Sequence, residues 1–246
     1  MQLATQSSDI EVWTKNPALL SHFNLNNSYP RSGSHLLRFL IELLTEKPTC
    51  GCQMQSRDKP LYMNHYPETV PFNISRDNVS DFISYKYHSV TDVPWDKVNK
   101  YILLIRSPRE AMIRMRGSEL SSKDIDYYFS IIDSFLSFKD PKCLFFYEDM
   151  ITKKSEFVKE LAKFFGDVNP EKLEYVLKNI DHLYELSSKG KGRAWAGVKS
   201  KGQTYFYYQM AKKEEYKNWE PYLHEKIKDK KYDFIRDKYK PDYDNI

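Results

Sequence analysis

A short polar turn between an extended segment and an apolar segment carries residues whose types suit anion binding. The turn reads Tyr29-Pro30-Arg31-Ser32-Gly33-Ser34-His35, and the apolar run 36–44 follows it directly. Pro30 ends the extended segment, and Gly33 permits close approach of the backbone to a ligand. The first N–H groups of the following helix carry partial positive charge. A strand, turn and helix of this kind can hold an anion at the helix start.

The side chains of the turn narrow the choice of anion. Arg31 supplies a planar cation, and Ser32, Ser34 and His35 add hydrogen-bond donors. This set favours phosphate or sulfate, although a carboxylate also fits. The sequence lacks Gly-x-x-x-x-Gly-Lys-Ser/Thr and Gly-x-Gly-x-x-Gly, which disfavours nucleotide-triphosphate and dinucleotide sites. The alternative is an ordinary turn that caps a helix, with Arg31 in solvent.

Length, charge and cysteine content limit the class of protein. The 246 residues suffice for one α/β domain with a full core, and we predict a single domain over 1–246. A net charge of +4 suits an anionic cofactor or substrate but is too weak to imply nucleic acid. Three cysteines without a Cys-x-x-Cys pair indicate no metal site and no disulfide framework. Without a signal peptide or a membrane span, we expect a soluble, cytoplasmic protein.

Apolar runs that alternate with helical patterns predict a mostly parallel sheet flanked by helices. The expected strands are 22–28, 81–88, 101–106 and 143–147, and the expected helices include 36–44, 121–138 and 170–180. The range 48–79 is rich in proline and shows no clear element. The tail 205–246 reads as charged helices without chemistry.

Several polar residues fall at the ends of the predicted strands. Arg106 follows the most apolar strand, where open α/β sheets hold ligands, although a buried structural arginine paired with a carboxylate is equally compatible. Lys86 and His88 are two residues apart, so on one strand they share a face. The Gly- and Lys-rich range 187–202 suits either phosphate capture or a flexible linker.

Three stretches in order resemble sulfotransferases that use 3′-phosphoadenosine 5′-phosphosulfate (PAPS). The turn 29–34 resembles their 5′-phosphosulfate loop, and Arg106-Ser107-Pro108-Arg109-Glu110 resembles their 3′-phosphate motif. Phe146-Tyr147-Glu148-Asp149-Met150 is similar to the Tyr-Glu-Asp-Leu of these enzymes, and Lys86-Tyr87-His88 looks like their Lys-x-His. The resemblance covers about residues 22–210 and implies a P-loop NTPase-like α/β fold.

The resemblance also implies an activity and a set of site residues. The activity is transfer of a sulfuryl group from PAPS to an acceptor hydroxyl of a small molecule or carbohydrate. His88 would be the base, with Arg31 and Lys86 stabilising developing charge. Arg106 would bind the 3′-phosphate, and Tyr147 would contact adenine. The implied cofactor-binding residues are Arg31, Ser32, Gly33, Ser34, His35, Arg106, Arg114, Tyr147, Lys199, Lys201 and Gly202.

The sequence departs from the cytosolic enzymes at several positions. Arg31 replaces a lysine and is a poor proton donor, but Arg-Ser-Gly-Ser also occurs in Golgi carbohydrate sulfotransferases, which favours a sugar acceptor. Leu36 stands in place of an adenine-stacking tryptophan. Arg114 stands in place of a 3′-phosphate serine, where it either binds that phosphate or faces solvent. The interval from Arg106 to Tyr147 is shorter than in the cytosolic enzymes, so the acceptor-pocket residues of those enzymes cannot be assigned to positions in this sequence.

Two other functions remain compatible with the sequence. One is an ATP-dependent small-molecule kinase of the same fold, which would require magnesium. The other is a non-catalytic protein that binds a nucleotide or glycan without turnover. The identity of the acceptor and the oligomeric state stay open.

Overall fold

Five parallel strands form one sheet in the computed structural model, which describes residues 22–47, 49–51, 83–91, 93–116, 120–189 and 219–240. The strand order is β2-β3-β1-β4-β5, and every neighbouring pair is parallel. This arrangement confirms the predicted α/β class. The strands are β1 (Phe23–Asn27), β2 (Thr49–Gly51), β3 (Ser84–Tyr87), β4 (Val98–Ile105) and β5 (Lys142–Phe146).

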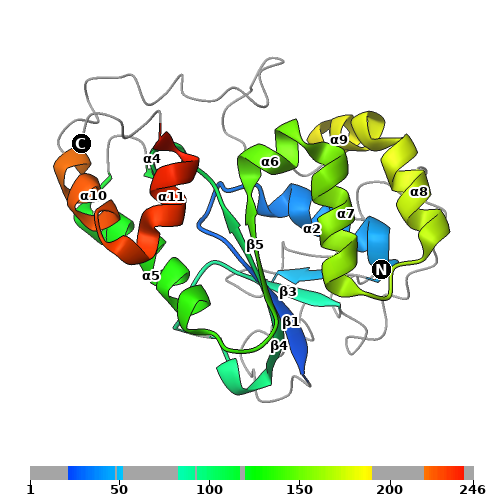
Figure 1. Ribbon diagram of the computed structural model, residues 1–246, viewed down its shortest axis with the longest axis horizontal. Helices are drawn as coiled ribbons and strands as arrows, with labels where there is room; N and C mark the ends of the chain where they lie inside the picture. The colour runs from blue at the N-terminus through cyan, green and yellow to red at the C-terminus, as the bar shows by residue number, and fades with distance from the viewer. Residues whose placement is uncertain are drawn as a thin grey trace, which may run out of the picture.

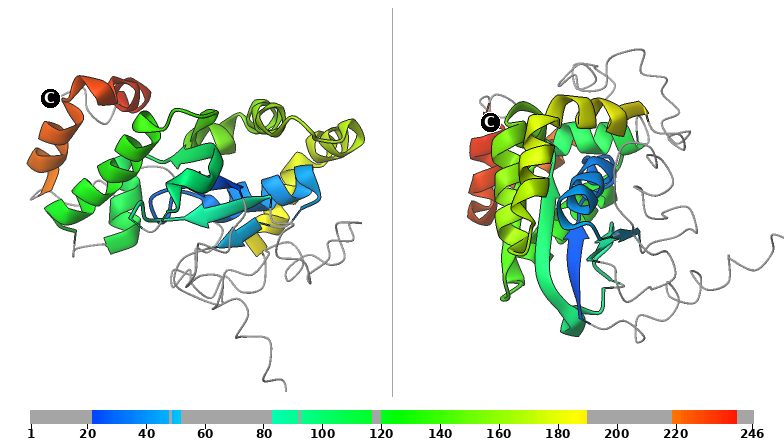
Figure 2. Two further views of the ribbon diagram at one scale, coloured as in Figure 1. Left: turned by 90° about the horizontal axis from the view of Figure 1, so that it is seen from below. Right: turned by 90° about the vertical axis from the view of Figure 1, so that its right-hand side faces the viewer.

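Helices cover both faces of the sheet (Figure 1 and Figure 2). One face carries α2 (Ser34–Thr45), α6 (Tyr147–Thr152), α7 (Lys154–Phe165), α8 (Pro170–Lys178) and α9 (Ile180–Lys189). The other face carries α4 (Pro108–Arg116), α5 (Ser122–Ser137), α10 (Glu220–Ile227) and α11 (Asp233–Lys238). Two short 3-10 helices, η3 (Trp95–Lys97) and η7 (Lys230–Tyr232), precede β4 and α11.

Strand β4 shows how the sheet separates two apolar cores. Tyr101, Leu103 and Ile105 pack in the core that contains α4 and α5. Ile102 and Leu104 point to the opposite face and pack in the core that contains α2 and α7. All five side chains are buried, as the continuous apolar run predicts. Each such side chain contributes about 1.5 to 3 kcal/mol by leaving water.

Capping residues mark several helix ends, and the predicted starts of the helices 121–138 and 170–180 are confirmed, although the second helix already ends at Lys178. The Asn169 side chain accepts a hydrogen bond from the Glu171 N–H at the start of α8. Ser121 and Asp124 form a capping box at the start of α5. Gly166 follows the last residue of α7 with φ 88°, a backbone region that favours glycine.

Strand β2 was not predicted, because residues 49–51 lie inside a range that shows no sequence pattern. The expectation of no element is therefore wrong for this strand. Arg38 and Glu42 of α2, both fully buried, bind Thr49. The Thr49 N–H donates to Glu42 Oε1 at 2.9 Å, and Arg38 Nη2 donates to the Thr49 carbonyl at 3.0 Å. These contacts are tertiary, so a local pattern cannot indicate them.

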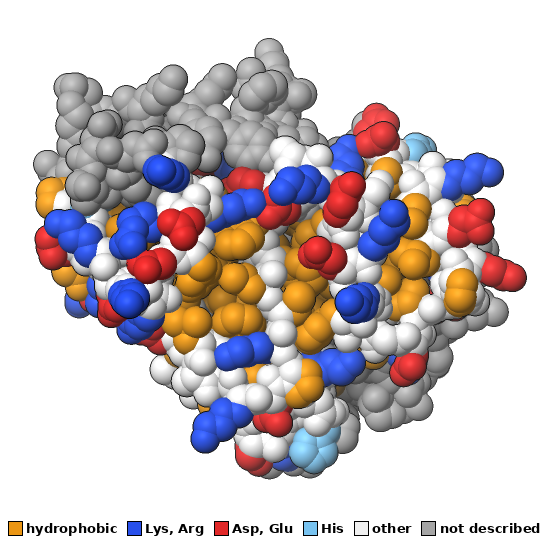
Figure 3. All heavy atoms as spheres, in the orientation of Figure 1, with side chains coloured by type: hydrophobic (Ala, Val, Ile, Leu, Met, Phe, Trp, Pro, Cys, Tyr) orange, Lys and Arg blue, Asp and Glu red, His pale blue; other side chains and the backbone are white. Residues whose placement is uncertain are grey.

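Apolar side chains are visible between the two groups of helices in Figure 3, on the side where β5 is the edge strand. Acidic and basic side chains are interspersed over the helices around them. Among the described residues, no helix is both long enough and apolar enough to cross a membrane.

Candidate functional site

The turn between β1 and α2 lies at the carboxyl end of the middle strand. The sheet extends from β1 through β3 and β2 in one direction and through β4 and β5 in the other. Open α/β sheets hold ligands where the strand order reverses in this way. The turn is closed by the Ser32 N–H, which donates to the Tyr29 carbonyl at 3.2 Å. Gly33 precedes α2, and because glycine has no side chain, it cannot cap the first N–H groups of that helix.

Buried hydroxyl groups gather at this turn. The Ser28 and Ser32 hydroxyls are buried, and they find no hydrogen-bond partner in the part of the chain that the structure describes. A buried polar group without a partner costs about 1 to 3 kcal/mol. Two such groups at the turn indicate a position where a polar ligand or water completes the hydrogen bonding. The Tyr29 ring points elsewhere and packs against Tyr127 and Tyr128 of α5.

Tyr147 and Arg106 bring the three motif regions into contact. A Cβ atom on Gly33 would lie 2.4 Å from Tyr147 Cδ2, so the ring packs directly on the glycine backbone. The Arg106 guanidinium lies 4.3 Å from the centre of the Tyr147 ring, within the range of a cation–π contact. Arg106 Nη1 also donates to the Arg31 carbonyl at 3.1 Å. Residues 31, 33, 106 and 147 therefore form one cluster at the ends of β1, β4 and β5.

Arg31 has an unusual backbone conformation within this cluster. Its φ of 71° lies in the left-handed region, which costs a non-glycine residue about 1 to 2 kcal/mol. The Arg106 hydrogen bond to the Arg31 carbonyl offsets part of that cost. The Arg31 side chain itself is exposed at the surface of the turn.

A buried carboxylate links two arginines beside the cluster. Glu110 Oε2 lies 3.0 Å from Arg114 Nε and 3.7 Å from Arg106 Nη2. Glu110 is 1% exposed, and Arg106 is 6% exposed. Burial lowers the pKa of Arg106, and the nearby Tyr147, Glu110 and Glu148 oppose that shift. Arg106 is thus both buried beside a carboxylate and placed at the end of β4, so its two sequence interpretations do not exclude each other.

Lys86 lies on β3, next to β1. Its register partner on β1 is Asn26, and its side chain is buried. Tyr85 and Tyr87 pack in the core on the α5 face, so the alternation of the strand directs Lys86 to the α2 face. Lys86 therefore lies on the same face as the helix whose start follows the turn.

His88 follows the end of β3 and contacts the turn. Its Nδ1 lies 2.6 Å from the Ser28 carbonyl oxygen. A carbonyl can only accept, so Nδ1 carries the proton in the neutral ring and Nε2 is the basic nitrogen. The sequence prediction placed His88 inside a strand over 81–88, whereas β3 ends at Tyr87. His88 is held instead by its hydrogen bond to the residue that follows β1.

The remaining predicted site residues differ in exposure, and some of them lie outside the described residues. Ser34 is buried at the start of α2, whereas His35 is exposed. Arg114 is 30% exposed in its side chain. Lys199, Lys201 and Gly202 lie outside the described residues. Tyr147 begins α6, although the sequence pattern assigned it to the end of a strand.

Sequence reasoning gave no role to Glu148 or to the C-terminal segment that contacts it. Glu148 Oε1 accepts from the Ser107 N–H at 3.1 Å, and Glu148 Oε2 accepts from the Tyr239 hydroxyl at 2.5 Å. Glu148 belongs to the stretch 146–150 that resembles a sulfotransferase motif, and this resemblance is the sequence signal that could have identified it. Tyr239 stands in a charged tail without any motif, so no local signal could have found it.

No protein-family model matches the sequence, and the search of curated protein sequences found no match. Among solved structures, the chain is similar to the crystal structure of mouse sulfotransferase SULT7A1 in complex with PAP. The TM-score is 0.51 at 16% sequence identity, over 95% of this chain and 93% of that chain. At this identity the similarity shows the fold alone. The chain therefore has the α/β fold of sulfotransferases, as the sequence resemblance implied.

Proposed function

We propose that the protein transfers a sulfuryl group from PAPS to an acceptor hydroxyl. The observation that carries this proposal is the cluster formed by Arg31, Gly33, Arg106 and Tyr147 at the ends of three parallel strands. These residues come from the three stretches that resemble sulfotransferase motifs. The solved structure with the same fold contains PAP, 3′,5′-adenosine bisphosphate, which is the product that PAPS leaves after transfer.

The residues present fit such a nucleotide at both of its charged ends. The Arg106 and Arg114 guanidiniums, held by Glu110, supply two cations for the 3′-phosphate. The α2 start and the buried Ser32 hydroxyl supply donors for the 5′-phosphosulfate. Tyr147 lies between these two ends, where it would contact the adenosine portion. We also assign Ser34, His35, Lys199, Lys201 and Gly202 to cofactor binding.

The proposed transfer assigns a role to each remaining residue. PAPS supplies an activated sulfuryl group: a bond forms from the acceptor oxygen to sulfur while the bond from sulfur to the 5′-phosphate breaks, leaving its electron pair on that phosphate. His88 Nε2 takes the proton from the acceptor hydroxyl, because the Ser28 carbonyl keeps the other nitrogen protonated. Lys86 and Arg31 stabilise the negative charge that develops on the leaving phosphate.

The proposal also includes the domain organisation, the cellular location and the class of acceptor. We propose a single domain over residues 1–246 and a cytoplasmic location. The acceptor would be a small molecule or a carbohydrate, and the Arg-Ser-Gly-Ser sequence of the turn favours the carbohydrate.

Calorimetric binding of PAP, ATP and 5′-AMP tests the cofactor. We expect PAP to bind more tightly than 5′-AMP, without any need for magnesium. Replacing Arg106 with Ala should weaken PAP binding roughly thirtyfold, because a charged hydrogen-bond partner of the 3′-phosphate is lost. Arg109→Ala is the matched control, since Arg109 lies in the same motif but binds Glu220 at 3.0 Å. Equal affinity for PAP and magnesium-bound ATP would contradict the proposal and favour a kinase.

A second test concerns the base. The variants His88→Ala and His88→Asn should each lower sulfuryl transfer by at least about a hundredfold while PAP binding persists, because neither can take the acceptor proton. Asparagine can still donate to the Ser28 carbonyl, so it separates proton transfer from support of the turn. His182→Ala is the control, because His182 is exposed on α9. An active His88→Asn variant would exclude His88 as the base.

A further inference from the structure

Glu148 joins three segments that are far apart in the sequence. Its carboxylate accepts one hydrogen bond from the Ser107 N–H at the end of β4 and one from the Tyr239 hydroxyl after α11. Ser107 directly follows Arg106, whose guanidinium contacts the Tyr147 ring and the Arg31 carbonyl. One side chain thus connects the end of α11 to the backbone that carries Arg106.

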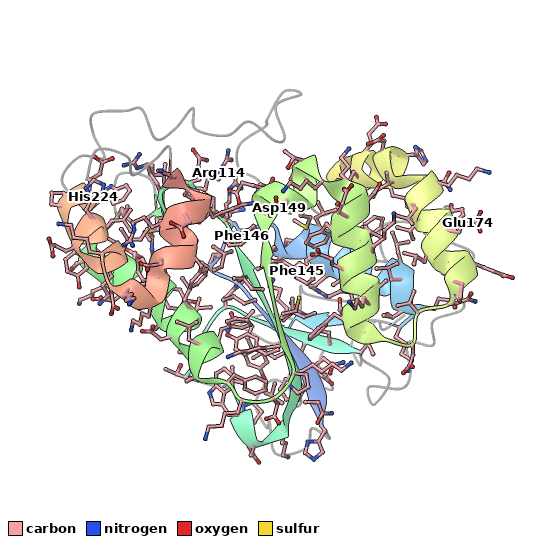
Figure 4. All side chains as sticks on the ribbon, in the orientation of Figure 1. Arg114, Phe145, Phe146, Asp149, Glu174 and His224 are labelled. Atoms are coloured by element: carbon pink, nitrogen blue, oxygen red, sulfur yellow. The ribbon has the colours of Figure 1, made fainter. Side chains whose placement is uncertain are left out.

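A second set of contacts holds α11 against the same motif. Lys238 Nζ lies 2.5 Å from Asp149 Oδ2 and 4.9 Å from the centre of the Phe146 ring. The Tyr239 ring meets Phe146 edge to face, with 5.9 Å between the ring centres. In Figure 4, Phe146 and Asp149 lie at the upper end of β5, beside α11. The end of α11 therefore packs on the residues immediately before and after Tyr147 and Glu148.

The surroundings of Glu148 make these donors energetically important. Burial raises the pKa of the Glu148 carboxyl, and the hydrogen bonds from Tyr239 and the Ser107 N–H, together with the Arg106 charge, oppose that rise. A carboxylate that loses one donor in such a place is less well stabilised as an anion. The groups that face Glu148 are therefore coupled, and the Tyr239 hydroxyl is one of them.

We propose that Tyr239 is a positioning residue for the 3′-phosphate site. Its hydroxyl holds Glu148, Glu148 holds the Ser107 N–H, and this chain of hydrogen bonds fixes the backbone from which Arg106 reaches the nucleotide. Supporting contacts of this kind keep a binding side chain in its productive geometry. This inference rests on the proposed function, because it gives α11 and the residue after it a role in the selectivity of the same nucleotide site.

The test compares two buried tyrosines of the C-terminal segment. Tyr239→Phe removes the hydroxyl that binds Glu148, and Tyr232→Phe removes the hydroxyl that binds Asp133 at 2.7 Å on α5. Both rings are 1% exposed, so both variants keep their packing and lose one hydrogen bond to a carboxylate. The measured quantity is the ratio of the dissociation constants of 5′-AMP and PAP, taken well below the melting temperature of each variant. A general loss of stability does not change this ratio.

We expect Tyr239→Phe to lower the ratio roughly fivefold and Tyr232→Phe to leave it at the wild-type value. Glu148→Ala is a second variant that tests the same link if Tyr239→Phe folds poorly, because alanine accepts neither hydrogen bond. The double variant Tyr239→Phe/Glu148→Ala should be no less selective than Glu148→Ala alone, because both substitutions break one chain of contacts. A wild-type ratio of one would overturn the proposed function and this inference with it. A high wild-type ratio that Tyr239→Phe leaves unchanged would overturn the positioning role alone.

Discussion

At Gly33, both the backbone conformation and the packing of neighbouring side chains require glycine. Its φ of 93° lies in the left-handed region, where a side chain is strained. Its backbone also lies so close to Tyr147 and Met150 that a Cβ would be 2.4 Å and 2.9 Å from their atoms. Glycine at position 33 is therefore needed for Tyr147 to pack against the turn, in addition to any contact that Gly33 makes with a ligand.

Replacing Gly33 with Ala should lower the free energy of unfolding by about 3 kcal/mol, because conformational strain and overpacking add. The same change should weaken PAP binding, since Tyr147 must move. Gly166→Ala is the control for binding: nothing lies within 4 Å of an added Cβ there, and with φ 88° and ψ −47° it should lose about 1 to 3 kcal/mol by backbone strain alone. Urea unfolding measures the two losses of stability, and calorimetry measures PAP binding, which only Gly33→Ala should weaken. Unchanged PAP binding in Gly33→Ala would show that the contact with Tyr147 is unimportant.

At the scale of elements, α11 is attached to α6 by the ion pair between Lys238 and Asp149. Burial alone would raise the pKa of Asp149, but the hydrogen bonds and charges of Lys238 and Lys153 outweigh it, so the pKa is lowered. The side chains of Lys238 and Asp149 are 24% and 27% exposed, which leaves them partly shielded from solvent. A carboxyl whose pKa is lowered on folding stabilises the protein above its unfolded pKa. That stability disappears as the pH falls through the folded value.

Asp149→Asn should therefore lower the free energy of unfolding by about 1 kcal/mol near neutral pH. The difference from wild type should shrink as the pH falls below about 3.9, the ordinary pKa of aspartate. Asp181→Asn is the control, because Asp181 is 84% exposed and its ion pair with Lys154 should contribute only tenths of a kcal/mol. Denaturant unfolding followed by circular dichroism across this pH range measures the change. A pH-independent loss in Asp149→Asn would show that its charge is not the cause.

At the scale of the whole molecule, the parallel sheet brings distant residues to one edge. Arg31 and Arg106 are 75 positions apart, and Glu148 and Tyr239 are 91 positions apart, yet each pair shares a hydrogen bond. The carboxyl ends of β1, β4 and β5 all lie at this edge because the strands run in the same direction. A site can thus use short motifs that are widely separated in the chain.

Local sequence patterns were sufficient for the α/β class, for the existence of β4, which was predicted over 101–106 and spans Val98–Ile105, and for the turn that contains Gly33. Each depends on neighbouring residues: the spacing of apolar side chains, the conformational range of glycine and the missing N–H of proline. The parallel direction of the sheet also follows from strands alternating with helices.

The contacts between elements could not be read in the same way. Strand β2 is held in place by hydrogen bonds between Thr49 and the buried side chains of Arg38 and Glu42. A strand of three residues is too short to show an alternation of apolar and polar side chains in the sequence. The link from Tyr239 to Glu148 depends on how α11 packs on β5 and α6. Such contacts form only after the chain has closed long loops, so their partners are set by packing in three dimensions and leave no trace in local spacing.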